Sequence, residues 1–271
     1  VDNIHNLVTS LNLDLYTQVV DWREMKDLQL SYLKSGIANA DTPTDHAFGY
    51  VAYHQAQKYG IKHILSGFNF VSESILPRAW GYSAADARLV KAIQKEFGTT
   101  RLKTYPLMGT LKRTYWYPYV RRIQTHFPLN FMPYHYAEAK ETIAREVGWR
   151  DYGGKHYESI FTRWFQGYYL PTRFGFDKRL AHYSSLIVAG EMTRDEALVM
   201  LETENYPEDL RRQDHDFVAK KLGISTEELD TIMASPTKHY TDYPNSEALQ
   251  QRVFEFTAGV GRVLRRLRVL R

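Results

Sequence analysis

The chain contains no cysteine, which excludes disulfides, cysteine-ligated zinc and a cysteine nucleophile within these residues. It also has no apolar run long enough to span a membrane and no signal peptide, so the sequence predicts no transmembrane segment. Together these absences favour the cytoplasm. The motifs of a P-loop nucleotide site, a zinc protease and a serine hydrolase are absent as well, which argues against those enzyme classes.

Neither sign of charge dominates, because 35 Lys and Arg residues face 31 Asp and Glu residues, for a net charge of +4. This small, dispersed excess favours anionic small molecules over nucleic acid as ligands. Hydrophobic residues make up 44% of the 271 residues, which is enough for a sizeable core in one large domain or two modest ones. Tyrosine occurs 20 times, which suits polar pockets with aromatic walls.

The N-terminal part predicts alternating strands and helices. Residues 13–20 are apolar, β-branched and aromatic, as expected of a buried strand. A helix that stops at Gly36 follows, and Thr44 is expected to cap a second helix over 45–59. The order continues with a strand at 61–65, a helix at 84–97 and a strand at 101–107. This rhythm predicts a partial doubly wound parallel sheet, since its strands are fewer than the usual number of about five or six.

After Pro106 the pattern turns helical. The clearest helix is 157–168, whose apolar side chains recur every three or four residues. A last predicted helix, 246–271, carries an arginine-rich face that is either a solvated surface or a contact for a membrane or an acidic partner. We therefore expect an α/β domain over 1–110 and a mostly helical domain over 111–271.

In open parallel sheets, ligands bind beyond the carboxyl ends of the strands, and one such end is the sequence SGFN at 66–69. Gly67 lets a ligand approach the backbone closely, while Ser66 and Asn69 offer hydrogen-bonding groups. Glu73 adds a carboxylate for Mg²⁺ or for a hydroxyl group. The alternative is a plain strand-to-helix turn, with Glu73 in the first turn of the helix.

A second candidate segment, 41–47, has the sequence DTPTDHA. Pro43 restricts the loop. Asp45 and His46 follow at a predicted helix start, where backbone N–H groups favour nearby anions. Both side chains are therefore candidates for catalysis at the mouth of a site, and simple helix capping is the alternative.

A third segment, 153–158, opens the clearest helix with two glycines. Lys155 and His156 project there as a candidate cradle for phosphate or carboxylate, and Glu158 begins the polar face of the helix. Further polar and cationic side chains crowd an aromatic-rich stretch: Arg163, Gln166, Lys178, Arg179 and His182. This mix suits a nucleotide sugar, and a solvated helix face is the alternative. The histidines show no metal-ligand spacing, so no metal site is expected.

Several stretches resemble known families. LSGFNFVSES, PRAWGY and KTYPLMGTLKRTYWY are similar to segments of the PP-loop ATP pyrophosphatases. The matching positions are Gly67, Asn69 and Glu73, then Pro106, Leu111 and Lys112. The stretch 148–197 is more specific and resembles the N-acetyl sugar amidotransferases of surface-polysaccharide clusters. DTPTDHA fits the same family, and the similarity ends near residue 245.

The resemblance implies a PP-loop fold, like that of the adenine nucleotide alpha hydrolases, and an ATP-dependent amidotransferase activity. The family is thought to convert the acetamido group of a nucleotide-linked N-acetyl sugar to an acetamidino group through an adenylated amide. AMP and pyrophosphate would be the products. The reaction would require ATP with Mg²⁺, and ammonia from a separate glutaminase subunit.

This hypothesis gives the candidate residues their roles. Four would bind ATP: Ser66, Gly67, Asn69 and Lys112. Five would serve catalysis: Asp45, His46, Glu73, Lys155 and His156. Six would bind the sugar substrate: Glu158, Arg163, Gln166, Lys178, Arg179 and His182.

The chain departs from the family in two respects. The SGGxDS pyrophosphate loop and a cysteine-rich zinc-binding segment are absent, and both would precede Val1. If these 271 residues are the whole polypeptide, we expect weak ATP binding and no turnover; if further residues precede Val1, we expect the family activity of the intact protein. Zinc is expected only in such a preceding segment. Two alternatives stay open, namely a PP-loop enzyme that modifies tRNA and a non-catalytic scaffold subunit for a glutaminase.

Overall fold

The structure is a computed structural model that describes residues 2–152, 159–203 and 206–255. Its α-helices are α1 (Asp2–Ser10), α2 (Trp22–Lys34), α3 (Thr42–Lys58), α4 (Phe70–Glu73), α5 (Ala87–Phe97), α6 (Tyr136–Val147), α7 (Ile160–Trp164), α8 (Leu170–Phe174), α9 (Lys178–Ala189), α10 (Arg194–Glu202), α11 (Glu208–Leu222) and α12 (Thr226–Ala234). Two π-helices are η2 (Lys112–Val120) and η4 (Phe165–Tyr169). Short 3-10 helices are η1 (Arg78–Trp80), η3 (Pro128–Asn130) and η5 (Tyr240–Asp242), and the strands are β1 (His63–Leu65) and β2 (Gln124–His126).

The predicted doubly wound sheet is wrong. The described residues form one two-stranded parallel sheet, in which Ile64 of β1 lies opposite Thr125 of β2. Only the strand expected at 61–65 is confirmed, over three of its residues. The segments 13–20 and 101–107 contain no strand, so most of the described fold is helical.

Both failed strands lack a strand partner among the described residues. Apolar, β-branched residues favour strands only where a neighbouring strand pairs with them, and Val19 is instead 82% exposed. In the segment 101–107, helix α2 provides the hydrogen-bond acceptor for the backbone. The Glu24 carboxylate of α2 accepts hydrogen bonds from the backbone N–H groups of Thr104 and Tyr105, at 3.0 and 2.7 Å. These contacts hold 101–107 against α2 as an irregular chain.

The main core forms around α2. Asp21 caps this helix by accepting hydrogen bonds from two first-turn N–H groups, and Gly36 follows its end with φ of +71°, as predicted. The helix buries Leu28, Tyr32 and Leu33 completely against α5, α7, η4, α11 and α12. Burying three such side chains contributes on the order of 5–8 kcal/mol of hydrophobic free energy, so α2 organises this half of the molecule.

The predicted helix 157–168 is present from Ile160 onward, and residues 157–158 lie outside the described residues. It changes from α-helix to π-helix at Phe165 and returns to α-helix at Leu170. Its apolar stripe is confirmed, because Trp164 and Phe165 are buried in the main core and Phe161 and Tyr168 pack against that core.

Two helix starts differ from the prediction. α3 begins at Thr42 rather than at residue 45, with Asp41 at the N-cap position and Pro43 in the first turn, where proline is favoured. α5 begins at Ala87 because the carboxylate of Asp86 caps it. At the other end of the chain, residues 247–255 are helical, and the rest of the predicted helix 246–271 lies outside the described residues.

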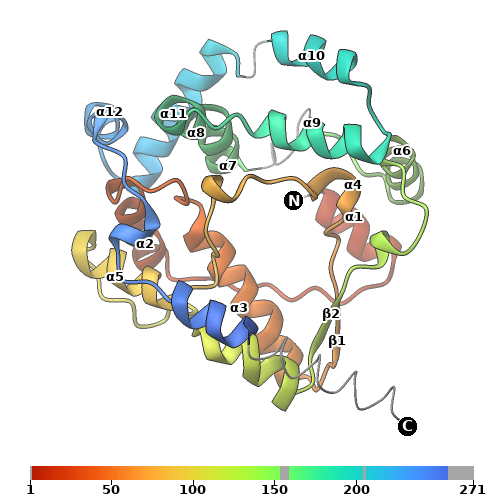
Figure 1. Ribbon diagram of the computed structural model, residues 1–271, viewed down its shortest axis with the longest axis horizontal. Helices are drawn as coiled ribbons and strands as arrows, with labels where there is room; N and C mark the ends of the chain where they lie inside the picture. Colours follow the sequence, from red (N-terminus) through yellow and green to blue (C-terminus); the bar gives the residue numbers. More distant parts are fainter. Residues whose placement is uncertain (1, 153–158, 204–205, 256–271) are drawn as a thin grey trace.

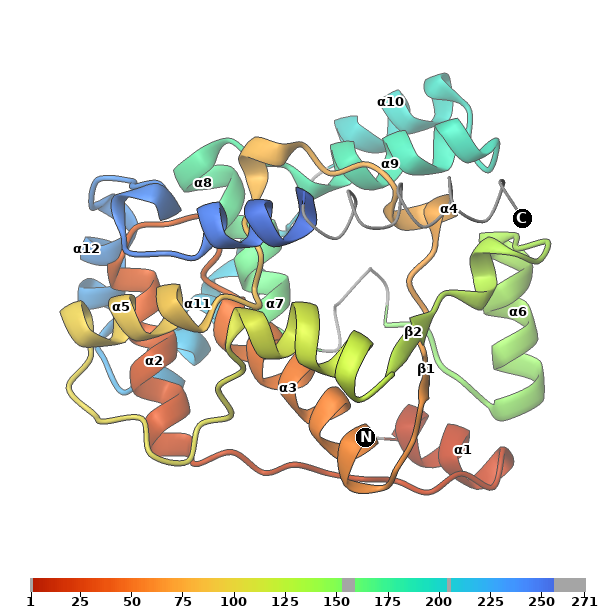
Figure 2. The same ribbon diagram turned by 60° about the horizontal axis from the view of Figure 1, so that its bottom comes forward.

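Figures 1 and 2 show how these elements are arranged. In both views α2, α5, α11 and α12 gather at one end of the molecule, and α1, α6, β1 and β2 gather at the other. α3 runs between the two ends, and α4 packs on α9. The first turn of α3 therefore lies near the main core, where segments from distant parts of the sequence meet.

Candidate functional site

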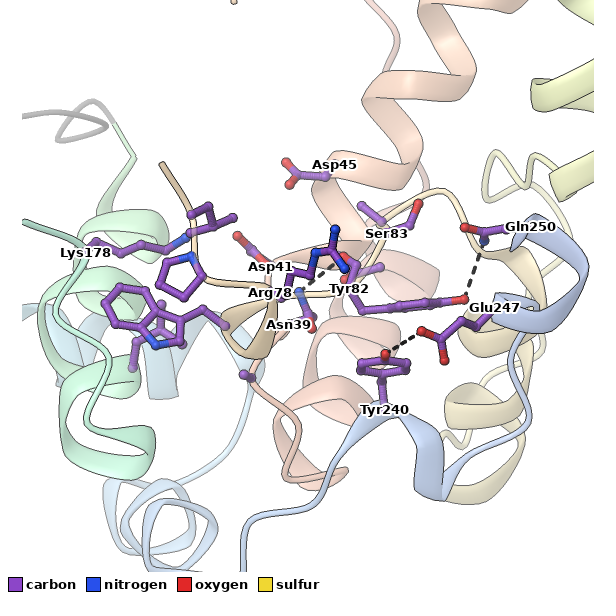
Figure 3. A pocket seen from close by; sticks show the side chains of 18 of the residues that line it. Asn39, Asp41, Asp45, Arg78, Tyr82, Ser83, Lys178, Tyr240, Glu247 and Gln250 are labelled. Atoms are coloured by element: carbon purple, nitrogen blue, oxygen red, sulfur yellow. Dashed lines mark hydrogen bonds between the residues drawn. The ribbon is translucent and has the colours of Figure 1, made fainter. Parts of the chain in front are cut away.

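A cavity of about 690 Å³ opens beside the first turn of α3. We call it the main cavity. Its wall is built from the start of α3, the loop 76–84, the first residue of α9 and the segment 240–254. The polar and charged residues on this wall include Asn39, Asp41, Asp45, Arg78, Tyr82, Ser83, Lys178, Tyr240, Glu247 and Gln250 (Figure 3).

Two acids at the start of α3 and one lysine of α9 meet at this cavity. Asp41 and Asp45 lie one helical turn apart, and Lys178 extends toward them from the opposite wall (Figure 3). The pKa of Asp41 is raised to about 7, mainly by burial and secondarily by the Asp45 carboxylate, while Lys178 acts to lower it. Asp41 is therefore a carboxyl group that can hold or release a proton near neutral pH.

Aromatic side chains shape the remaining walls. Trp80 of η1 stacks on Phe176, with ring centroids 5.0 Å apart. Tyr82 stacks on Tyr240, with centroids 4.1 Å apart and ring planes 13° apart. Burial, and secondarily the hydrogen bond to Asp86, raise the pKa of Tyr82 well above its ordinary value, so its hydroxyl stays protonated and donates to that carboxylate.

The buried Asp86 carboxylate fixes the segment 246–255 on the cavity rim. It accepts hydrogen bonds from the Tyr82 hydroxyl at 2.7 Å and from the Ser246 hydroxyl at 2.9 Å, as well as from the Ser246 backbone N–H. Farther along the rim, the Tyr240 hydroxyl donates to Glu247 at 2.8 Å. One carboxylate thus serves both as the cap of α5 and as the anchor of the rim.

Among the predicted catalytic residues, Asp45 lines the main cavity and His46 points into the protein. His46 Nδ1 lies 2.7 Å from the Ala84 carbonyl oxygen, and Nε2 lies 2.9 Å from the Met108 backbone nitrogen. Because a backbone N–H only donates, Nε2 accepts and Nδ1 carries the proton. Burial lowers the pKa of His46, consistent with a neutral ring. The geometry gives His46 a structural task that joins α3 to two loops.

Glu73 and the predicted ATP-binding residues are dispersed. Ser66, Gly67 and Asn69 follow β1, where the Asn69 side chain caps α4 by accepting from Ser72 N–H at 2.9 Å, and Glu73 ends that short helix. Lys112 begins η2 and lines a second cavity of about 410 Å³ together with Arg88 and Lys91. Ser66, Gly67 and Asn69 line neither the main cavity nor the second cavity.

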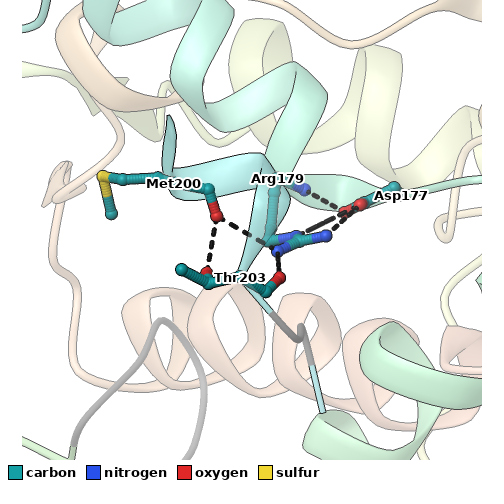
Figure 4. A network of polar contacts seen from close by, with 4 residues as sticks. All are labelled: Asp177, Arg179, Met200 and Thr203. Carbon is teal, nitrogen blue, oxygen red and sulfur yellow. Dashed lines mark hydrogen bonds and ion pairs between the residues drawn. The ribbon is translucent and has the colours of Figure 1, made fainter. Parts of the chain in front are cut away.

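Two of the predicted sugar-binding residues hold helices together. The Arg163 guanidinium makes a bidentate contact with the buried carboxylate of Asp214 on α11, at 2.7 and 2.8 Å. The Arg179 guanidinium binds Asp177 and donates to the carbonyl of Thr203 at 2.9 Å (Figure 4). A cation at the end of α10 stabilises that end of the helix.

The other predicted sugar-binding residues have varied settings. His182 Nδ1 lies 3.1 Å from the Ser72 carbonyl oxygen, Gln166 is half-buried in η4, and Lys178 lines the main cavity. Lys155, His156 and Glu158 lie outside the described residues. The predicted roles of all these residues stay predictions. Of the six expected sugar ligands, the structure brings Lys178 to the main cavity.

The sequence interpretation missed several residues of the main cavity. Asp41, Arg78, Trp80 and Tyr82 line it, and none was a candidate. The stretch PRAWGY, with a cation and two aromatic residues between turn-forming residues, was a usable signal for the loop. Asp41 gave no comparable signal, because an acid directly before a helix ordinarily serves as a cap.

The described residues contain no group of three or more His, Asp or Glu side chains arranged to hold a metal ion. In the same part of the chain, no helix is both long enough and apolar enough to cross a membrane.

A comparison with protein families gives a match in the C-terminal part of the chain. Residues 158–257 match the C-terminal domain of WbpG-like LPS biosynthesis proteins. This match supports a role in lipopolysaccharide biosynthesis, which agrees with the resemblance drawn from 148–197. A search of curated proteins gave no match. The WbpG-like range supplies Lys178, Tyr240 and Glu247 to the main cavity, while Asp41 and Asp45 precede it.

Proposed function

We propose that this protein is an ATP-dependent amidotransferase that converts the acetamido group of a nucleotide-linked N-acetyl sugar to an acetamidino group. The amide oxygen would attack the α-phosphorus of ATP, and pyrophosphate would leave. Ammonia from a glutaminase partner would then add to the amide carbon, and AMP would depart with the former amide oxygen. The sugar retains its nitrogen throughout.

The observation that carries this proposal is the composition of the main cavity. Its volume of about 690 Å³ falls within the range of about 300–1,000 Å³ that is typical of small-molecule sites. Aromatic faces such as that of Trp80 suit a sugar ring, and the cationic group of Arg78 suits its phosphates. The acids Asp41 and Asp45 suit a reacting group that becomes positively charged.

The last point distinguishes amidination from transfer to a hydroxyl group. An acetamide is neutral, whereas the adenylated amide and the acetamidinium product each carry a positive charge on the acetamido unit. Carboxylates held in place beside that charge stabilise it without reorganising. Acids and cations that line one cavity therefore match a substrate that has an anionic end and a reacting end that becomes cationic.

The WbpG-like range supports the same proposal from an independent direction. It contributes part of the cavity wall, and the acids come from residues that precede it. For ATP, the three cations of the second cavity, Arg88, Lys91 and Lys112, suit a phosphate chain. ATP would carry its own Mg²⁺, and no step is assigned to the metal.

The test uses the full gene product with ATP, Mg²⁺, an ammonium salt and a panel of UDP-linked N-acetyl sugars. AMP release and product mass are followed together. The proposal predicts AMP only when a particular sugar is present, with the mass decrease expected when an oxygen atom becomes NH. AMP formed with tRNA in place of sugar would favour tRNA modification, and no AMP with either substrate would favour a scaffold role.

A further inference from the structure

Asp41 stands out from the other aspartates that precede helices in this chain. Asp21, Asp86 and Asp177 all have extended backbones, and their carboxylates accept hydrogen bonds from first-turn N–H groups. Asp41 has φ of −86° and ψ of −8°, and its side chain makes no capping hydrogen bond. It therefore occupies the capping position without performing the capping function.

The first turn of α3 does not need this carboxylate. The Thr42 N–H donates to the Asn39 carbonyl at 3.2 Å, and Pro43 has no N–H. The N–H groups of Thr44 and Asp45 donate to the backbone carbonyl of Asp41, at 3.1 and 3.4 Å. Because the backbone satisfies these donors, the carboxylate of Asp41 is available on the cavity wall, where Figure 3 shows Lys178 extending toward it.

Several charged or titratable groups surround the Asp41 carboxylate. Asp45 comes from the same helix, Lys178 from α9 and Arg78 from η1. The buried hydroxyl-bearing rings of Tyr32 and Tyr169 also interact electrostatically with Asp41. Burial and Asp45 favour the protonated form, and Lys178 favours the ionised form. A carboxyl group balanced in this way changes protonation state within the range in which enzymes operate.

The proposed reaction contains a proton transfer that needs such a group. When the lone pair of ammonia forms a bond to the adenylated amide carbon, the new nitrogen carries a positive charge and three protons. One of these protons must leave before the C–O bond to AMP breaks, since the amidinium product has two protons on that nitrogen. The electron pair of the broken bond departs with AMP.

We propose that Asp41 is a catalytic residue whose carboxylate accepts this proton from the added ammonia. The inference rests on the proposed amidotransferase reaction and names the base for its second half. Asp45, one turn along α3, places a second carboxyl group beside the cationic carbon centre. Lys178 faces both acids and limits their mutual repulsion.

The test separates the two halves of the reaction in the full gene product. Sugar-dependent exchange of labelled pyrophosphate into ATP reports adenylation, and amidine formation with an ammonium salt reports the second half. Asp41→Asn keeps the shape and loses the base. Asp41→Glu keeps a carboxyl group. Asp21→Asn is the matched control, because it makes the same change at an exposed cap that asparagine fills equally well.

Asp41→Asn is expected to retain pyrophosphate exchange while amidine formation falls by about 100-fold or more, the usual contribution of a general base. Asp41→Glu should recover part of the rate, and Asp21→Asn should match the wild type in both assays. At constant free ammonia, the wild-type rate should rise as the pH increases toward neutrality and then level off, and this rise should be missing in Asp41→Asn.

Two results would overturn the assignment of Asp41. One is amidine formation by Asp41→Asn at the wild-type rate. The other is an equal loss of exchange and amidine formation, which would indicate a role in binding or folding. A wild-type protein with no sugar-dependent exchange would instead overturn the proposed function itself, so the two failures are distinguishable.

Discussion

Replacing Asp86 with alanine should destabilise the protein far more than the loss of an ordinary helix cap. The Asp86 side chain caps α5, which alone is worth about 1 kcal/mol. It also accepts hydrogen bonds from the backbone N–H and the hydroxyl of Ser246. In Asp86→Ala the buried Ser246 N–H would lose its acceptor, at a cost of about 1–3 kcal/mol. The expected loss of unfolding free energy is therefore about 3 kcal/mol.

Urea denaturation followed by circular dichroism measures this loss, with Asp21→Ala as the control. Asp21 also caps a helix, but it is exposed, so water can replace its carboxylate and about 1 kcal/mol should be lost. Asp86→Ala should also speed tryptic cleavage after Arg252, because Asp86 anchors the rim segment. Equal destabilisation by the two substitutions, with unchanged cleavage, would refute the anchoring role of Asp86.

Three further predictions test the fold and the site. Gly36→Ala should cost at least about 1 kcal/mol more unfolding free energy than Gly175→Ala in urea denaturation. Both glycines have positive φ, but only Gly36 has a backbone oxygen 2.7 Å from the position of the added Cβ. Equal losses of unfolding free energy would contradict this. Since burial lowers the pKa of His46 below its usual value of 6.5, stability should fall as the pH drops below 6.5, and His46→Gln should weaken that dependence in denaturation measured across pH. Arg163→Ala strips the buried Asp214 of its bidentate partner and should cost about 3 kcal/mol; a normal melting temperature with a raised KM for the sugar would instead support sugar binding by Arg163.

Features fixed by neighbouring residues could be predicted from the sequence. The helix that becomes α2 is predicted to stop at Gly36, and a glycine stop acts within a few residues of the helix end. The buried stripe of α7 and η4 follows from the spacing of its aromatic side chains. The switch to a π-helix at Phe165 could not be predicted, because the spacing of the aromatic side chains does not change there.

The sheet could not be predicted because strand pairing is not a local property. Residues 13–20 and 101–107 both have strand-like composition, and a strand also needs a partner. In 101–107 the partner of the backbone is the Glu24 carboxylate, which lies 80 residues before Thr104 in the sequence. No pattern within 101–107 shows that an acid from a distant helix provides the acceptors.

The residues of the main cavity come from distant parts of the sequence. Asp45 and Lys178 both line this cavity, and their roles stay predictions. The ion pair of Arg163 could not be predicted from the sequence, since its partner Asp214 lies 51 positions away. Asp41 was missed because the backbone conformation, and not the residue type, decides whether an aspartate at a helix start acts as a cap.

The central claim is that the acetamido oxygen of a sugar is activated by ATP and replaced by nitrogen. The most direct measurement gives the full gene product a nucleotide-linked N-acetyl sugar whose acetyl oxygen is a heavy isotope, together with ATP, Mg²⁺ and an ammonium salt. Mass spectrometry then locates the label. The proposed reaction predicts that the heavy oxygen appears in the phosphate of AMP and is lost from the sugar. Label that stays in the sugar, or AMP that carries none, would contradict it.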